Sequence, residues 1–345
     1  MEQTAKTVLV SLVALLGSAS VLVWTKIVIR RWQGLTLVPF EPRRPVPWGA
    51  VSLVLCTLAT LTVHLGVLLA VGASPGVPAA RMTSDQIARL ALGSSAANLA
   101  VLVGGTTFLV LSVGASRHDL GLPGDRRTVW RDAALGLAAF AAATPVVYAM
   151  QAVLVRWFPS EHPIKIMLDE QLDLVSIAVS LFAAVIAAPL FEEFFFRLLV
   201  QGWFERLESW RAEARSEAVT GLPPGSLLAS ARRSDADPVG PADGAFVAGR
   251  PGRAGTSGAG GPPPLPPGRL PRGALPIAGS SFLFAAMHAG YGPDPIPLFV
   301  LATVLGYLYQ RTHRIVPCIT VHALFNAFSM TIYFLDRAAG NAVAG

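Results

Sequence analysis

Two adjacent glutamates and an arginine interrupt an apolar stretch of this chain, which reads AAPLFEEFFFR from Ala187 to Arg197. On a helix, Glu193 and Arg197 are i and i+4 on one face, so they can form an ion pair. Glu192 lies about 100° round the helix, where Arg197 does not easily reach it. An unpaired carboxylate in apolar surroundings suits proton transfer near neutrality. The alternative is that both glutamates only hold helices together.

Two further apolar stretches carry imidazole and carboxamide groups. The first reads FLFAAMH and ends at His288, and the second reads VPCITVHALFN and contains His322 and Asn326. His322 and Asn326 are again i and i+4, so their side chains face the same way. Together with a spare glutamate on a third helix, these groups could hold a water and present donors to a developing oxyanion. Such a set predicts hydrolysis of an amide without a Ser or Cys nucleophile.

A zinc site could use the same atoms. His288, His322 and Glu192 would form a His₂Glu ligand set with an open position for water. The HExxH metalloprotease sequence is absent, and Cys56 and Cys318 lie in apolar runs that offer no Cys-based metal site or disulfide framework. Zinc is therefore an alternative to a cofactor-free mechanism.

The elements that must position these residues are membrane helices. Of the 345 residues, 53% are hydrophobic and only 14% are charged, whereas a soluble domain is about a quarter charged. Apolar runs long enough, or nearly so, to cross about 30 Å of hydrocarbon predict an all-α polytopic membrane bundle of about eight transmembrane helices. They lie roughly at Val8–Val28, Trp48–Val71, Leu90–Val113, Ala133–Val155, Leu174–Phe204, Ala274–Tyr291, Ile296–Gln310 and Ile315–Leu335. His64, in the second run, is interpreted as a hydrogen-bonded core residue.

Basic residues set the predicted orientation. Of the 27 Lys and Arg, 19 lie in connections that follow odd-numbered runs. The positive-inside rule makes these connections cytoplasmic, in an integral protein of the plasma (inner) membrane. The net charge of +6 is therefore interpreted as membrane-flanking, with membrane lipid and no nucleic acid as a partner. The first run continues to Trp24, past the small residues from Gly17 to Ser20, which favours a retained anchor over a cleaved signal peptide.

Glycine and proline are concentrated in one connection. Residues 221–273 hold 12 of the 32 Gly and 11 of the 27 Pro. Such a composition buries too little apolar surface to offset chain entropy. A disordered cytoplasmic insertion is therefore predicted over 205–273, after N-terminal transmembrane helices over 1–156 and within a membrane core over 157–204 and 274–345.

The three polar segments resemble the motifs of the CPBP family, the CAAX-protease and bacteriocin-processing, or Abi, intramembrane proteases. The match consists of EExxxR from Glu192, FxxxH from Phe284 and HxxxN from His322. It covers roughly Leu174–Leu335 and implies a helical membrane core of the type found in type II CAAX prenyl endopeptidases. The long insertion between the first two motifs departs from the usual short connection.

The resemblance implies an endopeptidase of the glutamic type that cleaves membrane-associated or lipid-modified substrates, with prenylated or bacteriocin-like peptides as examples. Glu192 would be the general base that activates water. The residues that would position water or stabilise the tetrahedral intermediate are His288, His322 and Asn326. The residues that would support the site structurally are Glu193, Arg197 and Phe284.

Two other functions fit the same residues. The charges could form the proton or ion relay of a membrane transporter, although no internal repeat or pair of broken helices is visible. The chain could also be an immunity or scaffold protein with vestigial catalytic motifs.

Overall fold

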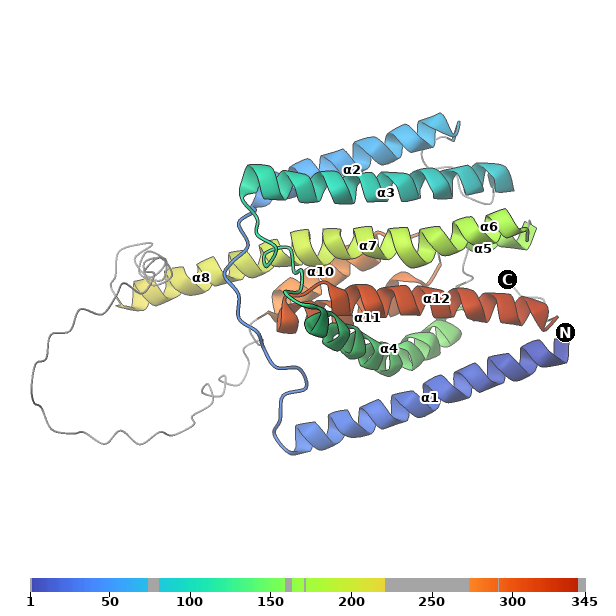
Figure 1. Cartoon of the computed structure of the whole chain (residues 1–345), viewed down its shortest axis with the longest axis horizontal. Coiled ribbons are helices and arrows are strands. Elements are labelled where there is room, and N and C mark those ends of the chain that lie inside the picture. The colour runs from blue at the N-terminus through green and yellow to red at the C-terminus, as the bar shows by residue number, and fades with distance from the viewer. Residues whose placement is uncertain are drawn as a thin grey trace, which may run out of the picture. The chain divides into compact units, whose positions relative to one another are not determined.

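The computed structural model describes residues 2–73, 81–158, 163–170, 172–220, 273–290 and 292–340. The regular elements in these ranges are all helices (Figure 1). Six of them are long and apolar enough to cross a membrane. The predicted all-α polytopic membrane fold is thereby confirmed. The chain divides into two compact units, one of residues 1–206 and 275–345 and one of residues 207–274.

Four long helices come first: α1 (Glu2–Trp32), α2 (Ala50–Ala70), α3 (Ser84–Val113) and α4 (Arg126–Leu154). A capping box starts α3, because the Thr83 side chain accepts from the Gln86 N–H while the Gln86 side chain accepts from the Thr83 N–H. Asp125 caps α4 by accepting from the Thr128 N–H. The bend of α4 in Figure 1 is consistent with Pro145 inside this helix, since proline removes one helical hydrogen bond.

The fifth predicted run belongs to a continuous helical rod that contains two π-helical segments. After the short helix α5 (Pro163–Glu170), the rod consists of α6 (Leu174–Leu181), the π-helical η2 (Phe182–Ala187), α7 (Ala188–Glu192), the π-helical η3 (Glu193–Gln201) and α8 (Gly202–Thr220). The predicted disordered insertion over 205–273 starts too early, because residues 205–220 are helical. This stretch is rich in Glu, Ala and Arg and contains no Gly or Pro before Gly221. The predicted disorder over 221–272 lies outside the described residues.

Three helices complete the chain: α10 (Ala274–Ala286), α11 (Pro295–Thr312) and α12 (Val316–Ala338). About eight spans were predicted, and the described residues hold six helices of sufficient length and apolarity. The difference lies in α10 and α11, the predicted sixth and seventh spans. With 13 residues, α10 extends only about 20 Å at 1.5 Å per residue, which is short of the hydrocarbon thickness.

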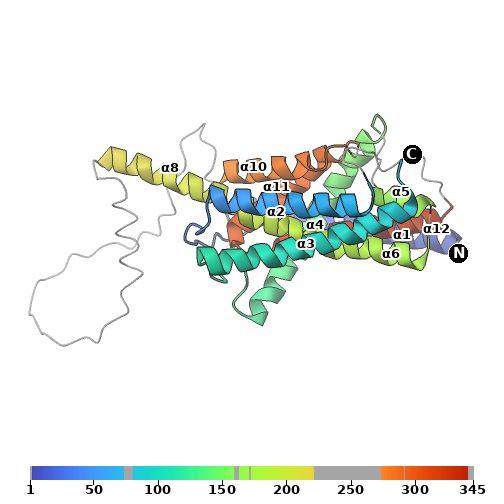
Figure 2. The ribbon, with the colours of Figure 1, turned by 90° about the horizontal axis from the view of Figure 1, so that it is seen from above.

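In the first unit, the rod lies between α3 and α12 (Figures 1 and 2). α12 packs against α4, α1 and α11 as well as η2 and α7, and α2 packs on the outer side of α3. α4 and α12 approach closely at Gly136, where an added Cβ would lie 2.6 Å from Thr320 Cβ. This packing brings the three motif-bearing segments together.

Candidate active site

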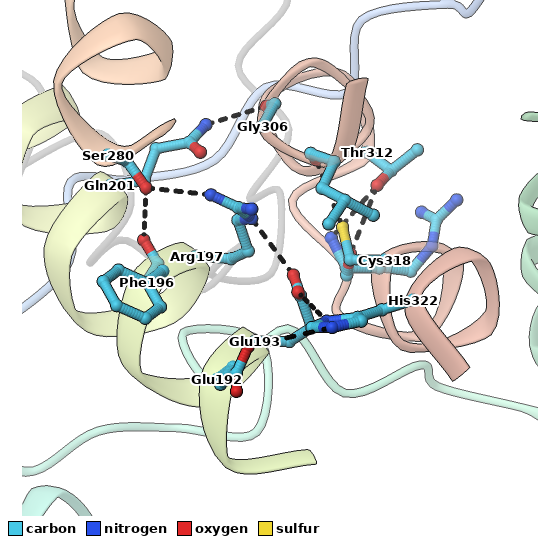
Figure 3. A network of polar contacts seen from close by, with 12 residues as sticks. Glu192, Glu193, Phe196, Arg197, Gln201, Ser280, Gly306, Thr312, Cys318 and His322 are labelled. Carbon is cyan, nitrogen blue, oxygen red and sulfur yellow. Dashed lines mark hydrogen bonds and ion pairs between the residues drawn. The ribbon is translucent and has the colours of Figure 1, made fainter. Parts of the chain in front are cut away.

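A fully buried ion pair forms the inner part of the site (Figure 3). Arg197 Nε donates to Glu193 Oε2 at 3.0 Å, and both side chains have no exposed surface. Arg197 Nη1 also donates to Ser280 Oγ at 3.0 Å, and this hydroxyl donates to the Phe196 carbonyl at 2.8 Å. The ion pair expected from the i, i+4 spacing is therefore present, and it ties η3 to α10.

His322 lies between the two adjacent glutamates. Its Nδ1 is 2.8 Å from Glu193 Oε1, and because an ionised carboxylate only accepts, Nδ1 carries the proton of this hydrogen bond. Its Nε2 is 3.7 Å from Glu192 Oε2, too far for a direct hydrogen bond. The Glu192 side chain is 20% exposed, and its Oε2 has no hydrogen-bond partner among the described residues. The two carboxylates thus have different surroundings, Glu193 in the interior and Glu192 at its edge.

The π-helical turn η2 explains the position of Asn326. The Ala188 N–H bonds to the Ala183 carbonyl, five residues back. The next residue, Pro189, has no N–H, so this turn supplies no main-chain donor to the Ala184 carbonyl. Asn326 Nδ2 donates to that carbonyl at 2.7 Å. One N–H of the carboxamide therefore joins α12 to the rod, and the other N–H and the oxygen remain for other partners.

Phe284 is a packing centre for the predicted residues. Its ring is fully buried and lies 5.3 Å from Arg197 Cζ, with its centroid 4.9 Å from that of His288 and 5.6 Å from that of His322. The Phe284 carbonyl accepts from His288 Nδ1 at 2.9 Å, which caps the last turn of α10. The imidazole of His288 is thereby fixed through Nδ1, and Nε2 is its other functional atom.

A cavity of about 1040 Å³ has all four predicted catalytic residues in its wall: Glu192, His288, His322 and Asn326. They come from α7, the turn after α10, and α12, whereas α2 and α3 supply further wall residues. The lining of the cavity is mostly apolar. The volume of the cavity is at the upper end of the range for ligand sites. Glu193 and Arg197 are not part of the wall and lie behind it.

This wall also contains a second polar pair, which was not predicted from the sequence. His64 on α2 and Asn98 on α3 both line the cavity, and His64 Nε2 lies 3.1 Å from the Asn98 carboxamide. His64 Nδ1 lies 2.9 Å from the Thr60 carbonyl, so the predicted hydrogen bonding is present, but the residue faces the cavity. A usable signal was the spacing of Thr57, Thr60 and His64, which puts polar groups on one face of an apolar helix.

Metal ligands are not grouped in the described part of the chain, where no three His, Cys, Asp or Glu side chains are arranged to hold an ion. His322 Nδ1 is engaged by Glu193 and leaves only Nε2 for a metal. The zinc alternative with Glu192, His288 and His322 stays a prediction.

Residues 267–328 match a family model described as type II CAAX prenyl endopeptidase Rce1-like. The predicted family resemblance is confirmed. The match contains the complete FxxxH and HxxxN motifs. The EExxxR motif lies upstream of the matched residues. This Rce1-like match supports a CAAX-type protease, a membrane hydrolase in a lipid environment with a peptide substrate. No curated protein and no solved structure matches the chain.

Proposed function

We propose that this protein is an intramembrane endopeptidase in which Glu192 activates water to hydrolyse peptide bonds of membrane-associated or lipid-modified substrates. The observation that supports this most is the contrast between the two glutamates. Glu193 is held by Arg197 and His322, whereas Glu192 stands at the cavity wall with His322 Nε2 at 3.7 Å. A separation of this length can be bridged by one water molecule.

In the proposed reaction, the Glu192 carboxylate removes a proton from this water as the water oxygen bonds to the scissile carbonyl carbon. The carbonyl π electrons move to its oxygen and give a tetrahedral oxyanion. The protonated Glu192 then delivers its proton to the amide nitrogen as the C–N bond breaks. The products are a carboxylic acid and an amine, and the glutamate is regenerated.

Three side chains would orient these steps. His322 donates a hydrogen bond from Nδ1–H to Glu193, and this contact directs the Nε2 atom of His322 at the proposed water beside Glu192. Asn326 keeps one N–H that can donate to the oxyanion, since the other bonds to Ala184. His288 is fixed by the Phe284 carbonyl and presents Nε2 to the same cavity.

The mostly apolar cavity among membrane-length helices favours a peptide that arrives with membrane lipid, such as a prenylated or bacteriocin-like one. Placement in the plasma (inner) membrane with the odd-numbered connections in the cytoplasm belongs to the same proposal.

The proposal is tested by comparative peptidomics of membranes from cells that carry the wild type, Glu192→Gln or Asp85→Asn. Asp85 pairs with Arg89 at the exposed start of α3 and is not a cavity residue, so it is a matched carboxylate-to-amide control. Peptides cleaved by the wild type and Asp85→Asn should persist intact with Glu192→Gln. Equal peptide profiles for all three proteins would contradict the proposal.

A further inference from the structure

The wall built by α2 and α3 has a polar stripe, although the membrane-length stretches of both helices are mostly apolar. The exposed apolar residues of α2 include Val51, Val54 and Leu58, whereas Thr57, Thr60 and His64 line the cavity. The hydroxyls of Thr57 and Thr60 donate to carbonyls of their own helix at 2.8 Å, so their hydrogen-bonding protons are engaged. On this wall, His64 of α2 makes a polar contact with Asn98 of α3.

Hydrogen-bond chemistry fixes how this pair is arranged. The Thr60 carbonyl can only accept, so His64 Nδ1 carries the proton of the 2.9 Å contact between them. The Asn98 atom that lies 3.1 Å from Nε2 is the carboxamide oxygen. Because a neutral imidazole has a lone pair at Nε2 and the oxygen and nitrogen of a carboxamide are exchanged by a flip, we assign the Asn98 amide with its N–H toward Nε2. In that arrangement Asn98 keeps its carbonyl oxygen and one N–H, an acceptor and a donor side by side. These are the groups that pair with the N–H and C=O of one peptide unit.

A peptide that enters this cavity needs such partners. Each peptide N–H or C=O that loses water in apolar surroundings without a hydrogen bond costs roughly 1–3 kcal/mol by protein mutational data. The proposed catalytic residues serve only the bond that is cut, on the wall formed by α7, α10 and α12. Substrate residues that contact the part of the wall formed by α2 and α3 meet Asn98, which can accept and donate there.

We propose that Asn98 is a substrate-binding residue that hydrogen-bonds one peptide unit of the bound polypeptide in the cavity that Glu192 also lines. His64 is a positioning residue that holds the Asn98 carboxamide in the required orientation. This inference rests on the proposed endopeptidase function. Through these two residues, α2 and α3 would recognise the main chain of the substrate, whatever the side chains of the substrate are.

The test uses a synthetic peptide that spans one cleavage site found by the comparison of wild type and Glu192→Gln. Its Kd for the detergent-solubilised Glu192→Gln protein is measured by fluorescence anisotropy, and its KM and kcat are measured in the Glu192 background. Loss of one hydrogen bond predicts that Asn98→Ala raises Kd and KM about five- to tenfold, with kcat within about twofold of the wild type. His64→Ala should raise Kd to a smaller extent and should have no added effect in the Asn98→Ala background.

A purely structural role is separated by Gly93→Ala. A Cβ at Gly93 would lie 2.6 Å from Val67 Cγ1, so this variant disturbs the contact of α3 with α2 and removes no polar group. If Asn98 only joined the helices, Gly93→Ala and Asn98→Ala would lower the Tm and change kcat and KM in the same way, and the inference would be overturned. An unchanged Kd for Asn98→Ala, with cleavage still abolished by Glu192→Gln, would overturn this inference alone. Cleavage that survives Glu192→Gln would overturn both proposals.

Discussion

His322 Nδ1 lies 2.8 Å from Glu193 Oε1, and this contact gives the two neighbouring glutamates different surroundings. Glu193 also forms the ion pair with Arg197, so this buried carboxylate accepts hydrogen bonds from both Arg197 and His322. The contact with Glu193 also sets the ring of His322 so that Nε2 points to Glu192 at 3.7 Å (Figure 3). In the proposed mechanism, Glu193 thus supports the site and Glu192 activates water.

The two glutamates should differ in what they contribute to stability. Glu193→Gln leaves Arg197 as a buried, unpaired charge, so the free energy of unfolding should fall by about 3–5 kcal/mol. Glu192→Gln removes a carboxylate that is 20% exposed and has little hydrogen bonding, so its Tm should stay near that of the wild type. Thermal unfolding of the detergent-solubilised variants measures both. A larger loss of stability for Glu192→Gln than for Glu193→Gln would refute this assignment.

Ser280 should prove to be a structural part of the ion pair. Its hydroxyl accepts from Arg197 and donates to the Phe196 carbonyl, and the residue is fully buried. Ser280→Ala leaves both groups without this partner, so we expect a loss of about 1–3 kcal/mol in the free energy of unfolding. Thr303→Ala on α11 is the control, since that exposed hydroxyl donates only to a carbonyl of its own helix. Equal Tm values for the two variants would speak against this role.

The crossing of α4 and α12 should tolerate no side chain at Gly136. A Cβ there would lie 2.6 Å from Thr320 Cβ and 2.8 Å from the Pro317 carbonyl oxygen, and main-chain atoms cannot move aside cheaply. Gly136→Ala should therefore destabilise the protein by about 1–3 kcal/mol. A Cβ at Gly104 meets nothing within 4 Å, so Gly104→Ala should stabilise by up to about 1 kcal/mol through helix propensity. The prediction fails if the two Tm changes have the same sign.

Stability at acidic pH should depend on Asp119, in the loop after α3. Burial alone would raise its pKa, but hydrogen bonds from Arg44 and Ser116 hold the pKa below its ordinary value. A carboxyl with a lowered pKa in the folded state stabilises the protein above its unfolded pKa of about 3.9, and this contribution is lost as the pH falls through the folded-state pKa. Thermal unfolding between neutral and acidic pH should show a shallower loss of Tm for Asp119→Asn than for the wild type. Parallel pH profiles would show that Asp119 does not contribute.

A glutamic mechanism should be insensitive to metal removal. Cleavage by the purified protein should continue at the wild-type rate after incubation with EDTA or 1,10-phenanthroline, because the proposed steps use only protein groups and water. Inhibition by chelator that added zinc reverses would instead support the His₂Glu alternative.

Much of the site could be predicted because it depends on spacing within one helix. The i, i+4 separation of Glu193 and Arg197 was enough to expect their ion pair and to leave Glu192 unpaired. The position of Asn326 was harder, because it follows from Pro189 and the π-helical turn before it, and apolar periodicity does not distinguish π from α pitch.

Contacts between distant segments could not be predicted from the sequence alone. His64 and Asn98 are 34 residues apart, and only the packing of α2 on α3 brings them into one cavity wall. The length of α10 was overestimated for a related reason. Its apolar run continues to Tyr291, but the helix ends at Ala286, and His288 folds back to bond the Phe284 carbonyl.

The role of Glu192 is tested most directly with the purified protein in proteoliposomes and a peptide that spans an identified cleavage site. Glu192→Gln should lower kcat at least about a hundredfold, as expected for loss of a general base, with Tm and peptide Kd close to the wild type. Asp85→Asn, treated in the same way, should cleave at the wild-type rate. A Glu192→Gln protein that cleaves this peptide as fast as the wild type would contradict the account.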